Sequence, residues 1–276
     1  MIFDAPNRSA RGRHPLRCTV AYHEFSSSGS RDVYQLTPEV FRSQIAALQR
    51  AATRAGVDLR VTFDDAHRSQ IQLAVPVLEQ AGLHGLFFVP AAWVGVRPET
   101  ATWSDLCTLR SQGHAIGSHG HTHALLTLCS PANLELELTR SRNTLEDKLG
   151  CAVEAISMPG GRWSPTVAAG CYAAGYRQIY TSDPGTSDPG TTHPKATREV
   201  LNANTPGLPI AIVGRLVVRR TMSLDTLSRY ASGDRYILAR MQLEYRTKQI
   251  AKRLIGDVAY QTVWHRLLRA SVEDAL

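Results

Sequence analysis

Two adjacent carboxylates stand where a predicted strand gives way to a loop. Asp64 and Asp65 directly follow the apolar run Val61–Phe63. Because neighbouring side chains of an extended chain point to opposite sides, one carboxylate can hold a cation while the other faces a substrate. Acidic pairs at strand ends also serve as turns and helix caps. The pair therefore gains chemical meaning only beside a second cluster.

Three histidines within five residues supply that second cluster. His119, His121 and His123 follow the run Ala115–Ser118. Residues four apart in an extended chain are about 13 Å from each other, too far to share one ion, whereas a helical turn or a tight loop brings them together. Gly120 permits such a turn. We therefore predict that His119 and His123 bind a metal ion and that His121 points elsewhere.

The two clusters together make a common ligand set for a catalytic metal. Two imidazoles and one carboxylate bind Zn²⁺, or another divalent ion such as Co²⁺, Mn²⁺ or Ni²⁺, and leave positions open for water and substrate. The second carboxylate remains available as a general base, which fits metal-assisted hydrolysis. The five cysteines are scattered and include no Cys-x-x-Cys pair, so neither a thiolate site nor a disulfide framework is predicted.

The segments that carry these clusters alternate between short apolar runs and longer helix-like stretches, which is typical of βα units. The expected strands are Cys18–His23, Val57–Phe63, Gly85–Val89, Ala115–Ser118, Val153–Met158, Gln178–Thr181 and Ile212–Val218. The expected helices are Pro38–Ala55, Ile71–Gln80, Ser104–Ser111, Ala132–Leu149 and Pro165–Ala174. The pattern fits a closed barrel and an open sheet equally well. In both, the carboxyl ends of the strands carry the site.

The motifs resemble a known family. Thr62-Phe63-Asp64-Asp65, followed about fifty residues later by Ser118-His119-x-x-x-His123, resembles the polysaccharide deacetylase family, also called the NodB-homology or carbohydrate esterase family 4 domain. The resemblance runs from about Cys18 to Arg220. It implies an α/β fold, a distorted (β/α) barrel of about seven strands. The expected domains are an N-terminal extension (1–17), the NodB-like domain (18–221) and a basic helical appendage (222–276).

The resemblance also implies a role for each site residue. Asp65, His119 and His123 match the metal triad, which is usually occupied by zinc. Asp64 matches the general base that takes a proton from the attacking water. In the third motif, Met158–Arg162, the backbone N–H of Gly160 helps to hold the tetrahedral oxyanion.

Three departures from the family's pattern concern the same site. Ala66 stands where the family has glycine. The third motif lacks the arginine that orients the base, and Arg162 is the predicted replacement. The late run 215–220 has no histidine to serve as general acid for the leaving amine. Four histidines remain open for that role, and the sequence favours none of them: His23, His67, His121 and His193.

Composition limits the class of protein. With 43% apolar residues among 276, the chain can bury a core, and no apolar run is long enough to cross a bilayer. The polar N-terminal segment lacks the apolar stretch of a secretion signal, so a cytoplasmic location is expected. The net charge of +7 and the basic helical C-terminus fit two readings, a solvated surface packed on the main domain and contact with a membrane surface or lipid-linked carrier; no motif supports nucleic-acid binding.

These observations predict a metal-dependent deacetylase that hydrolyses the N-acetyl or O-acetyl group of an amino sugar in a polysaccharide, an oligosaccharide or a lipid-linked precursor. One alternative is a related carbon–nitrogen hydrolase acting on a small non-sugar amide, because a fold does not fix a substrate. Another is a glycan-binding pseudoenzyme, which the missing histidine suggests. The retained Asp64 counts against that reading.

Overall fold

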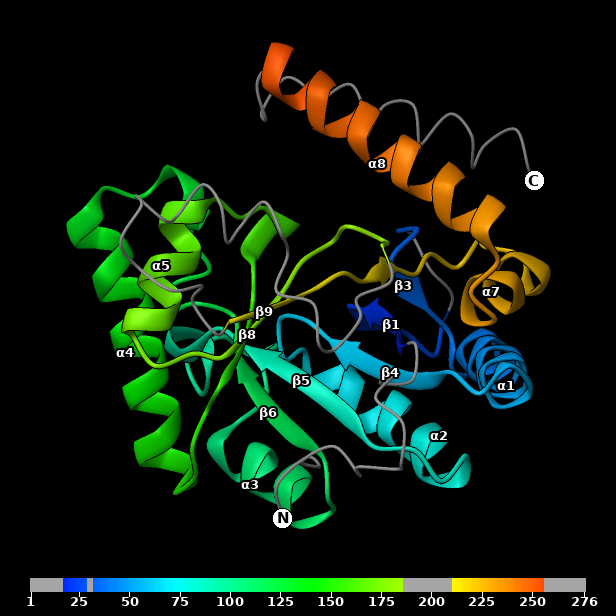
Figure 1. Ribbon diagram of the computed structural model, residues 1–276. Coiled ribbons are helices and arrows are strands. Elements are labelled where there is room, and N and C mark those ends of the chain that lie inside the picture. The colour runs from blue at the N-terminus through cyan, green and yellow to red at the C-terminus, as the bar shows by residue number, and fades with distance from the viewer. Residues whose placement is uncertain (1–16, 29–31, 186–209, 256–276) are drawn as a thin grey trace, which may run out of the picture.

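Eight parallel strands form one sheet in the computed structural model, which describes residues 17–28, 32–185 and 210–255 (Figure 1). Across the sheet they run in the order β10, β1, β4, β5, β6, β7, β8 and β9. Their bounds are β1 Arg17–Tyr22, β4 Asp58–Phe63, β5 Gly85–Val89, β6 Ala115–Ser118, β7 Ala155–Ser157, β8 Gln178–Tyr180, β9 Ala211–Val213 and β10 Leu216–Val217. A separate parallel pair consists of β2 Glu24–Phe25 and β3 Gln35–Leu36.

The two edge strands of the sheet are nearly consecutive in the sequence. β9 and β10 are the two edge strands of the sheet, where they pair with β8 and β1, yet only Gly214 and Arg215 separate them in the sequence. Three peptide units span at most about 11 Å, so the sheet must curl until its edges nearly touch. The expected distorted barrel is confirmed, with eight strands. The predicted single strand Ile212–Val218 is corrected, because it is two strands at opposite edges of the sheet. We call the junction between them, Gly214 and Arg215, the seam.

Helices cover the outside of the curled sheet (Figure 1). Their bounds are α1 Pro38–Ala55, α2 Val75–Gln80, α3 Trp103–Ser111, α4 Pro131–Leu149, α5 Pro165–Ala173, α7 Leu224–Ala231 and α8 Arg235–Ile255. Proline at the first helical position follows an N-cap side chain in α1, α4 and α5, where Thr37, Ser130 and Ser164 each accept a backbone N–H. α1, α3, α4 and α5 begin and end within one residue of the prediction, whereas α2 begins at Val75, four residues after the predicted Ile71, because Gln70–Ala74 form a π-helical turn.

Alternating side chains divide the core into two parts. Val61 and Phe63 of β4 belong to the large apolar core beneath the helices. On the other face of the sheet, Phe88 and Tyr180 form a smaller cluster, and the Arg60 guanidinium donates to the Tyr180 hydroxyl at 2.6 Å. The interior of the barrel is thus partly polar, which lets β4 carry charged chemistry at its carboxyl end.

The C-terminal helices differ in how they pack. Leu227 and Tyr230 of α7 belong to the main core, and the Tyr230 hydroxyl donates to the carbonyl of Thr19 in β1. α8 lies farther out (Figure 1), and its Tyr245 hydroxyl donates to the carbonyl of Gly161 at 3.4 Å. Within the described ranges, no helix is both long and apolar enough to pass through a bilayer.

Candidate metal centre and catalytic site

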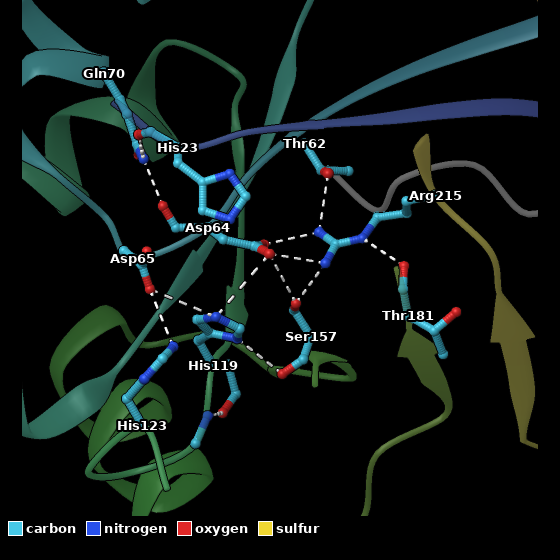
Figure 2. A network of polar contacts seen from close by, with 12 residues as sticks. His23, Thr62, Asp64, Asp65, Gln70, His119, His123, Ser157, Thr181 and Arg215 are labelled. Carbon is cyan, nitrogen blue, oxygen red and sulfur yellow. Dashed lines mark hydrogen bonds and ion pairs between the residues drawn. The ribbon is translucent and has the colours of Figure 1, made fainter. Parts of the chain in front are cut away.

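The three predicted metal ligands converge at the carboxyl ends of β4 and β6 (Figure 2). The Oδ1 atom of Asp65 lies 3.6 Å from Nε2 of His119 and 3.3 Å from Nε2 of His123. One ligand atom from each of the three residues falls within 4.8 Å of the others. Two ligands of a tetrahedral zinc ion at about 2.1 Å are about 3.4 Å apart, so the spacing fits a zinc-sized ion.

Two further observations support a metal at this position. Oδ1 of Asp65 is buried with no hydrogen-bond partner in the described part of the chain, which a cation between the imidazoles would remedy. His119 Nδ1 lies 2.9 Å from the carbonyl oxygen of Ser157. A carbonyl accepts but cannot donate, so Nδ1 carries the proton and Nε2 presents its lone pair toward Asp65. Burial and then the neighbouring His119 lower the pKa of His123 to about 4, which leaves that ligand neutral.

The ligand loop is not a helical turn. His123 has φ of 67° and Asp65 has φ of 71°, so two of the three ligands adopt the left-handed conformation that non-glycine residues rarely take. Each such residue costs about 1–2 kcal/mol. The tight-loop alternative for His119 and His123 is therefore the correct one. Ala66, with φ of 49°, adopts the same conformation where the family has glycine.

Asp64 is held by a buried arginine that the sequence reasoning did not identify. The guanidinium of Arg215 donates to Oδ1 of Asp64 at 2.7 Å and to Oδ2 at 2.8 Å, and its side chain is fully buried (Figure 2). Further donations go to the Thr62 and Ser157 hydroxyls and to the carbonyl of Thr181. This is a bidentate ion pair, and each hydrogen-bond partner of the guanidinium is an acceptor.

The ion pair fixes the charge of Asp64. Burial acts to raise the pKa of Asp64, but Arg215, together with His119, outweighs it and holds that pKa well below its usual range. Asp64 is therefore ionised at neutral pH. Its Oδ2 atom also lies 4.0 Å from Nε2 of His119, so a proton acceptor stands directly beside the metal ligands.

An arginine other than the predicted Arg162 pairs with Asp64. It is Arg215, which lies between β9 and β10, and the Ser157 hydroxyl contacts both Asp64 and Arg215. The role of Arg162 stays a prediction. The available signal was an arginine inside the apolar run 210–218. The prediction of that run as one strand did not identify Arg215 as a site residue.

The remaining predicted residues occupy different surroundings. Gly160 lies in the 3₁₀ turn Pro159–Gly161 with φ of 66°, three residues after Ser157, and its role in the oxyanion site stays a prediction. His23 follows β1 beside Asp64, whose backbone N–H donates to the carbonyl of Tyr22. Nδ1 of His23 is buried without a partner among the described residues, as is Nδ1 of His121. Nδ1 of His67 contacts Ser69, and His193 lies outside the described residues.

Sequence comparison places part of this chain in a family. The family model described as polysaccharide deacetylase matches residues 51–179. The Bacillus subtilis (strain 168) protein YxkH, whose name assigns it to the same family, is 26% identical over 125 residues. That match covers 45% of this chain and 44% of the relative, so the chain matches less than half the relative's length.

Solved structures share the fold. The deacetylase PplD of Streptococcus pyogenes, solved with acetate, is 17% identical with a TM-score of 0.65, covering 78% of this chain and 98% of that one. IcaB of Ammonifex degensii is 22% identical with a TM-score of 0.61, covering 80% and 98%. The resemblance read from the two motifs is thereby confirmed: residues 51–179, which match the polysaccharide deacetylase family model, include the predicted metal triad and Asp64.

Proposed function

We propose that the chain is a metal-dependent deacetylase that hydrolyses the N-acetyl or O-acetyl group of an amino sugar in a polysaccharide, an oligosaccharide or a lipid-linked precursor. The observation that carries the proposal is a division of labour between two adjacent carboxylates. Asp65 joins His119 and His123 in a ligand set, whereas Asp64 is ionised and held apart from it by Arg215. A glycan-binding protein has no need of the second, separately held carboxylate.

The chain's residues supply the steps of a hydrolysis. When bound by the triad, a metal ion polarises the acetyl carbonyl and activates a water. Asp64 accepts the proton that the water loses, and Arg215 keeps the carboxylate oriented throughout. The backbone N–H of Gly160 donates to the oxyanion that develops on the carbonyl oxygen. Cleavage of the carbon–nitrogen bond then yields acetate and a free amine, which takes up a proton.

Metal content and acetate release test this proposal separately. The purified protein should hold about one zinc-like ion per chain, and His119→Ala should lose it. Asp64→Asn should keep the metal and lose acetate release from acetylated oligosaccharides. A protein that binds metal and glycan but releases no acetate would be the pseudoenzyme. Release from small non-sugar amides, and not from sugars, would favour the alternative carbon–nitrogen hydrolase.

We also propose that the outer face of α8 rests on an anionic lipid surface, as a lipid-linked substrate would require. Tyr236, Leu243 and Ile250 recur every seven residues and are exposed, by 84% for Tyr236 and 64% for Leu243. Exposed arginines, Arg240 and Arg246, flank this stripe. α8 as a whole carries six Lys or Arg against one Glu. An apolar stripe bordered by cations is typical of helices that lie in a membrane interface.

Vesicle sedimentation tests the lipid contact. The full chain should bind vesicles that contain phosphatidylglycerol and not vesicles of phosphatidylcholine alone. Leu243→Glu should weaken this binding, whereas Leu128→Glu, a change at an equally exposed leucine outside α8, should not. Equal binding to both kinds of vesicle, or an equal loss in both variants, would contradict the proposal.

A further inference from the structure

A buried carboxylate outside the ligand set lies under the loop that carries two metal ligands. Glu137 projects from α4 and is only 8% exposed. The backbone N–H groups of His121 and Thr122 donate to its Oε2 atom at 2.8 and 2.9 Å, and the Thr122 hydroxyl donates to Oε1 at 2.5 Å. Three donors from the middle of the loop therefore meet on one side chain.

The backbone shape of the loop makes these donors hard to satisfy otherwise. Gly120 has φ of 78° and His123 has φ of 67°, so the chain between the two ligands belongs to no regular element whose ladder could accept its N–H groups. A buried N–H without an acceptor costs about 1–3 kcal/mol. The approach is also close, because a Cβ at Gly120 would lie 3.2 Å from Oε2 of Glu137.

The other side of the loop is fixed by a different element. The carbonyls of Gly120 and His121 accept from the backbone N–H groups of Ala91 and Ala92, which follow β5, at 3.1 and 2.9 Å. These contacts occupy acceptors of the loop and leave the donors of His121 and Thr122 to Glu137. The loop is thus held between the segment after β5 and one carboxylate of α4.

We propose that Glu137 is a positioning residue that sets the separation of His119 and His123 and so determines the affinity for the metal. This inference rests on the metal site of the proposed function. Holding the loop by its N–H groups keeps His123 in the left-handed conformation in which its Nε2 faces Asp65. Glu137 itself binds no metal, because both of its oxygens are turned to the loop. Outer partners of this kind commonly change metal affinity 10–100-fold.

The test is Glu137→Gln, which keeps the size of the side chain but replaces one acceptor oxygen with a donor. We expect zinc affinity, measured by competition with a chelator, to fall about 10–100-fold. Glu135→Gln is the matched control, because Glu135 lies on the same helix with an exposed side chain and should leave affinity unchanged. Thr122→Val removes only the hydroxyl donor and should lower affinity by about 2–10-fold.

A second measurement uses the metal-free protein. Hydrogen exchange at the amides of His121 and Thr122 should be slow in the wild type and in Glu135→Gln, and fast in Glu137→Gln. Unchanged zinc affinity together with unchanged exchange in Glu137→Gln would overturn the inference. If the wild type takes up no zinc, the proposed function fails, while the exchange rates still decide whether Glu137 holds the loop. If Glu137→Gln does not fold, Thr122→Val gives the decision.

Discussion

Replacing Arg215 with methionine should destabilise the fold, because it leaves Asp64 as a buried charge without a partner. Both side chains of the pair are buried, and the two nitrogen–oxygen distances are 2.7 and 2.8 Å. Removing one partner of such a pair leaves a buried charge without compensation, which costs about 3–5 kcal/mol of unfolding free energy. Methionine fills most of the same volume, so little of this loss is expected from a cavity.

The loss should depend on pH with a definite sign. In the wild type the pKa of Asp64 is lowered by folding, so the ion pair contributes stability above the unfolded pKa of about 3.9 and loses it only as pH falls through the low folded value. In Arg215→Met, burial loses its largest opposing influence, so the folded pKa of Asp64 rises even though His119 and His23 still lower it. The variant then loses stability as pH rises toward that value. The difference in unfolding free energy between the wild type and Arg215→Met should therefore be larger at about pH 7 than at about pH 5. It should grow by about 1.36 kcal/mol for each pH unit by which the folded pKa of Asp64 in the variant exceeds 5, up to pH 7.

Urea unfolding at the two pH values, with a chelator present, measures this without any substrate. The double variant Arg215→Met, Asp64→Asn removes the charge as well and should recover most of the stability. Arg162→Met provides the comparison that the sequence alone would suggest, and it should not change the pH dependence. An equal loss at both pH values in Arg215→Met, or no recovery in the double variant, would refute the assignment of Arg215 as the residue that keeps Asp64 ionised.

Three other variants address individual parts of the site. Ser157→Ala leaves a buried Arg215 N–H without its acceptor and should lower the unfolding free energy by about 1–3 kcal/mol in urea titrations, with zinc content unchanged. Gly160→Ala places a Cβ at positive φ, 2.8 Å from Cδ2 of Leu125, and should cost about 1–2 kcal/mol by thermal unfolding. His23→Gln should lower kcat for acetate release at least about 100-fold at constant zinc content if the imidazole donates the leaving-group proton; an unchanged kcat would exclude His23 from that role.

The candidate metal ligands were predictable because each lies in the few residues after the end of a predicted strand. The carboxylate follows one apolar run and the two imidazoles follow the next run but one, so strand ends alone place them, and parallel strands bring those ends to one edge of the sheet. The register confirms this, since β4, β5 and β6 are successive neighbours. Even the helix boundaries could be anticipated, as at Thr37 and Pro38, because caps act within a single turn.

The arginine that pairs with Asp64 was not predictable, because the two residues are far apart in the sequence. Arg215 and Asp64 are 151 positions apart, and they meet only when the sheet has closed. The run 212–218 is predicted as one strand from its apolar residues. Two residues are local signs of a break: the charged Arg215, and Gly214, where a side chain would collide with the carbonyl oxygens of Asp183 and Gly185.

Closure of the sheet at the seam and the charge of Asp64 therefore depend on the same contact. Only Gly214 and Arg215 link β9 to β10, which lie at opposite edges of the sheet, and the Arg215 side chain is fully buried. A buried arginine without a counter-ion would oppose closure of the barrel, and a buried Asp64 without Arg215 would be driven to protonate. Each charge compensates the burial of the other, so the closed barrel is the state in which Asp64 is ionised. The contact that forms when the sheet closes thus gives Asp64 the charge that the proposed general base requires.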